Sequence, residues 1–229
     1  MKYARNATQI GILTIGLLAL AGGCANNNKT AQVDRPPTDT DSIAEAPMPA
    51  IRPETFIAAG DLAVTRGQPL LAVEQYKKAL KANPNDTAVL KKLGLAQVKA
   101  NQLDGAAETF RRYVIVSGGS DDAYGTLGYC LELAGNKEGA EKTYLEGIKK
   151  HADGALVRIN YGLMLVRRNQ VDAAVEQMSK VLEPHETNYN IASVYEQLGR
   201  RDLAQFYYRR ALECKPGFAA AQQKLAMVE

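Results

Sequence analysis

Histidine and cysteine are the residue types in this chain best suited to nucleophilic or metal-binding chemistry, and the 229 residues contain two His and three Cys. His151 and His185 are far apart in the sequence. Neither has a Ser, a Cys or a carboxylate at a spacing that forms a catalytic triad or a zinc ligand set. We interpret both as solvated surface residues. We therefore expect no catalytic residue, no metal site and no cofactor, and predict that the chain is not an enzyme.

The charges of the chain are nearly balanced, with 28 basic against 25 acidic residues and a formal net charge of +3. Nucleic-acid binding needs a strong positive field, so we expect no nucleic-acid partner. Three basic pairs lie near the ends of predicted helices, where the helix dipole favours cations. We interpret these pairs as a solvated face: Lys77-Lys78, Arg111-Arg112 and Arg209-Arg210.

The N-terminus has the composition of a secretory signal peptide. Lys2 and Arg5 make its start basic, an apolar run follows at residues 10–21, and the small residues Gly22 and Gly23 come next. An apolar run of this length is too short to span a bilayer as a helix. We predict a signal peptide at residues 1–23.

Cys24 directly follows these small residues. The stretch resembles a bacterial lipoprotein signal, which implies that Cys24 becomes the first mature residue and carries a lipid anchor in the membrane. Ala25 in place of Asp implies the outer membrane, with the protein on its periplasmic face. Ala21 stands where that family usually has Leu, so a plain secretory signal with an incidental Cys is the alternative.

A tether is predicted at residues 24–52. Polar residues and four prolines dominate this segment, and its apolar side chains are few and scattered. Their burial cannot offset the entropy lost on ordering, so we expect the segment to be disordered.

The remainder of the chain repeats with a period of 34 residues. A glycine recurs at that spacing, an Ala follows it twelve residues later, and a large apolar residue follows four residues after that. These positions are Gly60, Gly94, Gly128 and Gly162, then Ala72, Ala106, Ala140 and Ala174, then Tyr76, Phe110, Tyr144 and Met178. A fifth unit, with Ala192, Ala204 and Tyr208, begins after only 30 residues, and we expect one helical turn to be missing near Glu183–Glu186.

Each unit has a helical period that is interrupted near its middle by Gly or Asn, which tolerate a left-handed backbone at a helix C-terminus. These residues are Gly67, Asn101, Gly135, Asn169 and Gly199. Three positions later, an acidic residue is expected to accept hydrogen bonds from free helix amides, at Asp104, Glu138, Asp172 and Asp202. We predict helix, tight turn, helix in each unit. The repeated glycine would allow the two helices of a unit to approach closely, and the large apolar residue would fill the gap to the next unit.

These features resemble the tetratricopeptide repeat (TPR). The string A-x3-Y-x2-A-x4-P is present twice, as Ala72, Tyr76, Ala79, Pro84 and as Ala204, Tyr208, Ala211, Pro216. The resemblance implies an all-α fold, a right-handed superhelical α-solenoid of five helix pairs (53–86, 87–120, 121–154, 155–184 and 185–218) with a capping helix at 219–229. The fourth-place Trp of the family is absent, and Arg158 at that place is expected to point outward.

The other two cysteines lie within this repeat. Cys130 occupies a place that is apolar in the other units, so we interpret it as a small buried hydrophobic residue. Two repeats separate it from Cys214, and we expect no disulfide between them.

In the TPR family, the first helix of each unit lines a concave groove that binds polypeptides. Carried over to this chain, the groove is an apolar strip with basic residues, suited to an amphipathic or extended segment with some acidic residues. Its predicted members are Ile57, Lys91, Leu95, Val98, Lys99, Tyr129, Ile159, Leu163, Val166, Arg167 and Tyr189. The alternative is that several of them only cover helix–helix seams. Chaperone-binding members grip a carboxylate with Lys and Asn, and we exclude that clamp because Leu95 stands in place of the Asn.

Architecture and length resemble small assembly lipoproteins of bacterial surface machines, including those of the tight-adherence (Flp) pilus and the type IV pilus secretin. This resemblance implies a non-catalytic scaffold that assists assembly or localisation of a pilus or secretion machine at the outer membrane. A periplasmic adaptor that docks cell-wall hydrolases or proteases is the alternative. The sequence identifies neither the partner protein nor the oligomeric state.

Overall fold

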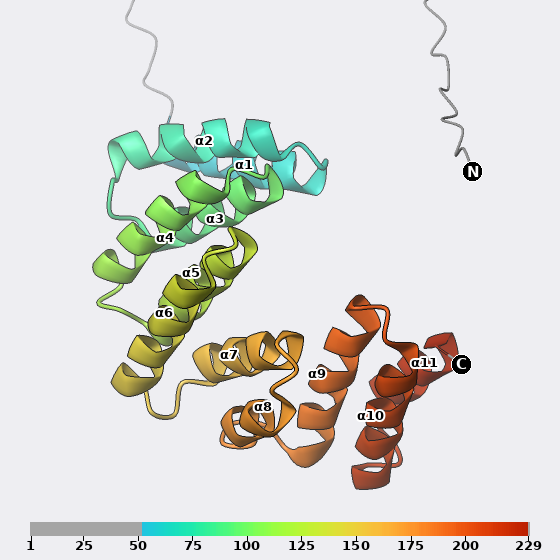
Figure 1. The fold of residues 1–229 in the computed structure, drawn as a ribbon. Helices are drawn as coiled ribbons and strands as arrows, with labels where there is room; N and C mark the ends of the chain where they lie inside the picture. Colours follow the sequence, from blue (N-terminus) through green and yellow to red (C-terminus); the bar gives the residue numbers. More distant parts are fainter. Residues whose placement is uncertain (1–51, 229) are drawn as a thin grey trace, which may run out of the picture. The chain divides into compact units, whose positions relative to one another are not determined.

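The computed structural model describes residues 52–228, and every regular element in that range is a helix (Figure 1). The predicted signal peptide, Cys24 and nearly all of the predicted tether lie outside the described residues. The helices are α1 (Pro53–Thr65), α2 (Pro69–Ala82), α3 (Thr87–Lys99), α4 (Leu103–Val116), α5 (Asp121–Leu133), α6 (Lys137–Lys150), α7 (Ala155–Arg167), α8 (Val171–Met178), α9 (Pro184–Gln197), α10 (Arg201–Cys214) and α11 (Ala219–Val228).

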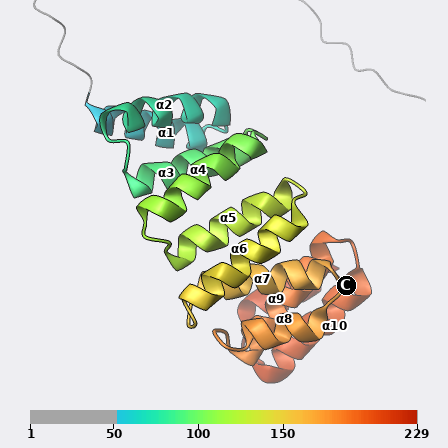
Figure 2. The same cartoon turned by 60° about the vertical axis from the view of Figure 1, so that its left-hand side comes forward.

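The helices form successive pairs, from α1 with α2 to α9 with α10. Each pair also packs on the next along the chain, and α11 packs on α10 (Figures 1 and 2). The predicted all-α solenoid is therefore confirmed. None of the described helices has the length and apolar character needed to cross a membrane.

A tight turn with a left-handed residue joins the two helices of each pair. The five residues predicted for this role all have positive φ: Gly67 (68°), Asn101 (57°), Gly135 (78°), Asn169 (61°) and Gly199 (70°). Left-handed backbone strains residues other than Gly, and Asn less than most. The choice of Gly or Asn at these positions therefore follows from the turn geometry.

Close approach of the paired helices depends on the repeated glycine. A Cβ atom at Gly60 would lie 2.5 Å from the ring of Tyr76, and one at Gly128 would lie 2.4 Å from the ring of Tyr144. Gly94 with Phe110 and Gly162 with Met178 are equivalent, at 2.5 Å each. The expectation that the large residue fills the gap to the next unit was therefore incomplete, because it packs first on the glycine of its own unit.

The acidic residues after the turns do not cap the second helices. Asp104, Asp172 and Asp202 lie in the first turns of α4, α8 and α10, and no side chain caps these helices with a hydrogen bond. In α6 the cap is Asn136, which accepts from the Gly139 amide at 2.9 Å. The capping prediction was wrong because these helices begin one residue before the acid. The acids still lie where the helix dipole favours negative charge.

The shortened spacing between units four and five has its origin in α8. This helix has eight residues, whereas α2, α4, α6 and α10 have fourteen each. The missing turns lie after Met178, and not near Glu183–Glu186 as predicted. Pro184 instead begins α9, and the Glu186 carboxylate accepts the backbone N–H of Glu183 at 3.0 Å.

Arg158 is buried, contrary to the prediction that it points outward. Only 7% of this residue is exposed. Its Nε donates to the Ala152 carbonyl at 2.8 Å, and a terminal guanidinium nitrogen donates to Gln177 Oε1 at 2.7 Å. Hydrogen bonds to neutral oxygens thus allow a cation to replace an apolar residue at this packed position.

The two histidines and the inner cysteine are part of the packed structure. His151 Nε2 lies 2.6 Å from the Gly119 carbonyl oxygen, and the His185 ring meets the Phe218 ring edge-on at 5.0 Å between centroids. Both histidines are half-buried, so their interpretation as solvated residues was wrong. Cys130 is fully buried as predicted, and burial raises the pKa of its thiol to about 11.

Candidate protein-binding site

The first helices of the pairs, α1, α3, α5, α7 and α9, carry the predicted binding residues, and we call the surface they share the first-helix face. It contains two hollows of about 260 Å³ each. The first hollow lies between α1 and α3 and is lined by Asp61, Val64, Tyr76, Lys92, Leu95, Ala96 and Lys99. The second hollow lies among α5, α7 and α9 and is lined by Tyr129, Asn160, Leu163, Arg167, Asn190, Ser193, Val194 and Gln197.

A partly buried polar cluster forms one wall of the first hollow. The Asp61 carboxylate accepts from the Tyr76 hydroxyl at 2.6 Å and from Lys92 Nζ at 2.6 and 2.8 Å. Partial burial raises the pKa of Asp61, but the hydrogen bonds from Lys92 and Tyr76 outweigh it and lower this pKa. Burial and the neighbouring carboxylate raise the pKa of Tyr76. Asp61 and Lys92 therefore neutralise each other's charge and are not free to pair with a ligand.

Among the lining residues of the first hollow, Leu95 and Lys99 are available to contact a bound partner. Leu95 is 43% exposed on α3, and Lys99 is exposed at the end of the same helix. No ion pair of Lys99 occurs within residues 52–228. The hollow thus offers an apolar wall and a free cation, which suits an apolar side chain beside a carboxylate.

The second hollow combines an exposed aromatic ring with side-chain amides. Tyr129 is 43% exposed and lines the hollow together with Leu163. Asn160 Nδ2 donates to the Gly125 carbonyl at 3.2 Å, and Asn190 Nδ2 donates to the Glu186 carbonyl at 2.9 Å. Each of these amides keeps an oxygen that can accept a backbone N–H of a bound polypeptide.

Arg167 borders the second hollow but is already engaged. Its guanidinium binds the Glu132 carboxylate through Nε at 2.6 Å and through a second nitrogen at 2.8 Å. This bidentate geometry is among the strongest arrangements that an Arg and a carboxylate form. The pair links α7 to α5, so Arg167 fixes the two helices rather than offering a free charge.

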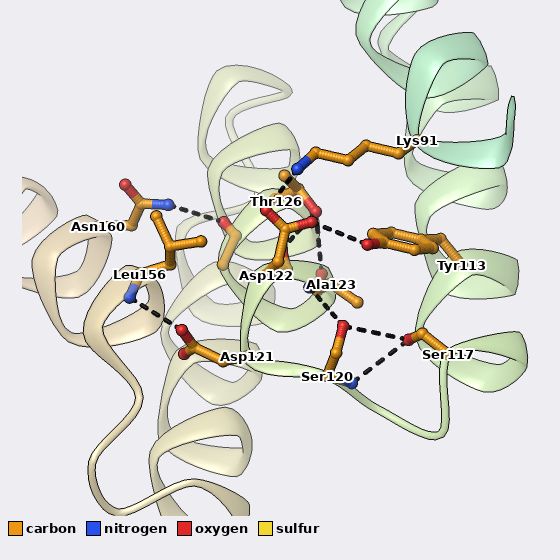
Figure 3. A network of polar contacts seen from close by, with 11 residues as sticks. Lys91, Tyr113, Ser117, Ser120, Asp121, Asp122, Ala123, Thr126, Leu156 and Asn160 are labelled. Carbon is orange, nitrogen blue, oxygen red and sulfur yellow. Dashed lines mark hydrogen bonds and ion pairs between the residues drawn. The ribbon is translucent and has the colours of Figure 1, made fainter. Parts of the chain in front are cut away.

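Cross-unit pairs of the same kind recur along the first-helix face. Lys91 Nζ lies 2.6 Å from Asp122 Oδ1, and the Tyr113 hydroxyl donates to the other oxygen of Asp122 at 2.9 Å (Figure 3). Further along, Glu196 accepts from the Tyr208 hydroxyl at 2.5 Å and pairs with Lys224 at 2.9 Å. The Lys91–Asp122 pair connects two neighbouring units, the Lys224–Glu196 pair connects the last unit to α11, and the two pairs neutralise Asp122 and Glu196.

Asp121 positions α7 from the preceding unit. One carboxylate oxygen accepts the backbone amide of Leu156 at 2.9 Å (Figure 3). The other accepts the backbone amide of Val157 at 3.0 Å. Gly154, the residue before α7, has no side chain that could cap these amides. The N-terminus of α7 is therefore capped by a residue of the preceding unit. The same helix carries Leu163, which lines the second hollow.

The structure divides the eleven predicted groove residues into four groups. Leu95, Lys99, Tyr129, Leu163 and Arg167 line the two hollows. Ile57, Val98 and Ile159 are half-buried and line neither hollow, whereas Val166 is 1% exposed and cannot reach a ligand. Lys91 is paired with Asp122, and the Tyr189 ring packs on Phe218 at 5.3 Å between centroids.

Sequence reasoning missed Lys92, Asn160 and Asn190 as lining residues. All three occupy the same place in their units, two residues before the small residue of the repeat at Gly94, Gly162 and Ala192. The signal that could have found them was this shared register. The prediction overlooked it because the TPR family most often binds through other places of the first helix.

Comparison with known proteins agrees with this geometry. Residues 57–123 and residues 185–218 each match a family model of the tetratricopeptide repeat. These two segments of the chain therefore resemble tetratricopeptide repeats. TPR proteins generally mediate protein–protein interaction, and the TPR fold is typically non-catalytic. No group of His, Cys, Asp and Glu in the described residues could hold a metal ion.

Several solved structures share the helical fold of this chain. MamA protein is 28% identical over 73% of this chain and 94% of its own, with a TM-score of 0.54. A second MamA structure is 29% identical over 70% and 96%, with a TM-score of 0.52. A thermophilic TPR protein of Thermus thermophilus is 21% identical over 77% and 98%, with a TM-score of 0.56. No curated protein matches the sequence at a significant level.

Proposed function

We propose that this TPR chain is a non-catalytic scaffold that binds a polypeptide segment of a partner along its first-helix face. The observation that carries the proposal is the pair of hollows lined by exposed Leu95 and Tyr129. The carboxylates named on this face are paired internally, whereas Lys99 has no ion pair in the described range. A partner segment with apolar side chains and one or more carboxylates therefore complements the face.

The N-terminal resemblance supports the proposed location, and the resemblance in architecture and length supports the proposed partner. A lipid at Cys24 would hold the scaffold at the periplasmic face of the outer membrane, where it would assist assembly or localisation of a pilus or secretion machine. The charged start, apolar run and Cys24 support this placement. An adaptor that docks cell-wall hydrolases or proteases would use the same face with a different partner.

Binding to defined partners tests the first-helix face. We expect the double variant Tyr129→Asp with Leu163→Asp to lose binding to a purified outer-membrane secretin, because it places two charges in the second hollow. Ile115→Asp is the matched control, since Ile115 is 78% exposed on the second helix α4. Undiminished binding by a folded double variant would refute the proposed face. Binding to a cell-wall hydrolase in place of the secretin would favour the adaptor.

Fractionation tests the anchor independently of the face. Cys24→Ala is expected to release the chain from membranes into the periplasmic fraction. A Cys24→Ala chain that still fractionates with the outer membrane would contradict lipidation.

A further inference from the structure

A third hollow, of about 420 Å³, lies outside the first-helix face, between α8, the start of α9 and α10. We call it the α8 hollow. Val171 and Val175 of α8, Thr187 of α9, and Tyr207 and Arg210 of α10 are among its lining residues. Its volume is in the range of pockets that bind ligands. The scaffold role proposed above does not use it.

The α8 hollow exists because α8 is short. With eight residues against fourteen in α2, it ends about 9 Å earlier at 1.5 Å per residue. Val175 is consequently 39% exposed, whereas Val73, at the same place of the first unit, is 3% exposed. An apolar position that is buried in one unit is therefore open in another.

Thr187 places an unsatisfied polar group in the wall of this hollow. The residue is 4% exposed, and its hydroxyl has no hydrogen-bond partner in the described part of the chain. Val89 occupies the same place in the second unit and is 2% exposed. A buried hydroxyl without a partner costs free energy, so this wall is less well satisfied than its counterpart in the second unit.

Arg210 supplies the charge that selects the occupant. Arg112, at the same place in the second unit, donates to the Pro84 carbonyl oxygen across the junction of units one and two. Arg210 makes no such contact in the described residues, and its guanidinium lies 5.6 Å from the centroid of the Phe206 ring. Arg210 therefore lacks the carbonyl partner that Arg112 has, and its guanidinium is available to a ligand in the α8 hollow.

We infer that the α8 hollow is a second docking site, which takes one or two helical turns of a partner polypeptide that carry an aliphatic side chain and a carboxylate. We propose a helical occupant because it would fill the space that the absent turns of α8 leave open. The aliphatic side chain contacts Val171, Val175 and the Tyr207 ring, and the carboxylate binds Arg210. Asp172, which also lines the hollow, accepts backbone N–H groups at the start of the bound helix.

The probe that tests this inference is a capped alanine-based helical peptide that carries one leucine and, one turn away, one glutamate. A second peptide has glutamine in place of the glutamate. We expect the full chain, purified in detergent, to bind the first peptide about tenfold more tightly, as measured by fluorescence anisotropy. Arg210→Gln should abolish this preference. Arg112→Gln is the matched control and should leave it intact.

A filling variant adds a second readout. Val175→Phe should block both peptides because the larger ring occupies the hollow. Thr187→Val is the conservative control, which keeps the packing and should leave the binding of both peptides unchanged. Thermal unfolding of each variant establishes that it is folded. Tyr129→Asp with Leu163→Asp should not change peptide binding, which separates this site from the first-helix face.

Four results would overturn the inference. One is a glutamate preference that survives Arg210→Gln, and another is a loss of binding that follows the first-helix variants instead. The third is self-association of the chain that only Val175→Phe disrupts, since it would assign the hollow to a second copy. The fourth is absence of binding by either peptide to the folded chain.

Discussion

At the scale of single residues, small side chains decide how closely the paired helices approach. Gly94 is buried, and a Cβ atom there would meet the Phe110 ring at 2.5 Å. The ring is itself 1% exposed and has no free space to move into. Overpacking of this kind distorts the core instead of filling a void.

Gly94→Ala should therefore lower the free energy of unfolding by about 1–3 kcal/mol, as measured by urea denaturation. Gly217→Ala is the matched control, because nothing lies within 4 Å of its added Cβ atom and its φ is not positive. We expect a change of no more than about 0.5 kcal/mol for the control. Equal stability of the two variants would contradict the close-packing argument.

Glu196 and Glu141 are two of the carboxylates that make the stability of the fold depend on pH. The hydrogen bond from Tyr208, with a further bond from Lys224, lowers the pKa of Glu196. The hydrogen bond from Arg168, with a further bond from Tyr161, lowers the pKa of Glu141. A carboxyl pKa that is lower in the folded state stabilises the fold fully above the usual value of 4.5 and loses that effect as pH falls through the folded value.

Glu196→Gln and Glu141→Gln should each reduce stability at neutral pH and flatten the loss of stability below pH 4.5. Chemical denaturation across this range measures both effects. The control is Glu146→Gln, which alters an exposed carboxylate with no ion pair in the described residues. Parallel pH profiles for Glu196→Gln and the unchanged chain would show that these bonds do not govern acid sensitivity.

At the scale of elements, helix ends are satisfied partly by neighbouring units. α3 is capped within its own sequence neighbourhood by Asp86, which accepts the Val89 amide at 3.0 Å. α7 begins after Gly154 and depends on Asp121 of the preceding unit. A cap that crosses a boundary couples the folding of the two units.

Asp121→Ala should cost about 1 kcal/mol of stability and speed hydrogen exchange at the Leu156 and Val157 amides. Asp121→Asn is expected to restore most of the protection because its amide oxygen still accepts. Asp86→Ala provides the comparison, because it should speed hydrogen exchange only at the amides of its own helix, α3. Unchanged exchange at both α7 amides would argue against the cross-unit cap.

At the scale of the whole described solenoid, stability is distributed along the chain and is weakest where units couple poorly. Repeat arrays gain stability from each unit and from each interface with a neighbour. α8 is six residues shorter than α6, and residues 179–183 after it are not helical. The interface between α8 and α9 is correspondingly small.

Amides in α8 and in residues 179–183 should therefore exchange with solvent faster than those in α6, the second helix of the preceding unit. Hydrogen-exchange mass spectrometry of the full chain compares these segments directly. The cores of α5 and α7 should remain protected under the same conditions. Equal protection of α8 and α6 would show that the shorter helix does not weaken the array.

The repeat, the fold class and the turn chemistry were predictable from the sequence because each depends on local rules. The left-handed turns are formed by Gly or Asn, and the close approach of paired helices requires a small residue, such as Gly60, Gly128 or Ala192. These requirements recur from unit to unit, so their spacing is visible without coordinates. Leu95, Lys99, Tyr129 and Leu163 could be assigned to the first-helix face for the same reason.

Only the tertiary structure decided which of these residues are free to bind. Val166 is buried, Lys91 and Arg167 are paired with carboxylates of other units, and Arg158 is satisfied by oxygens that a local rule would not identify. The α8 hollow likewise arises from turns that are absent between units. Burial and pairing depend on distances between separate helices, which repeat spacing alone does not specify.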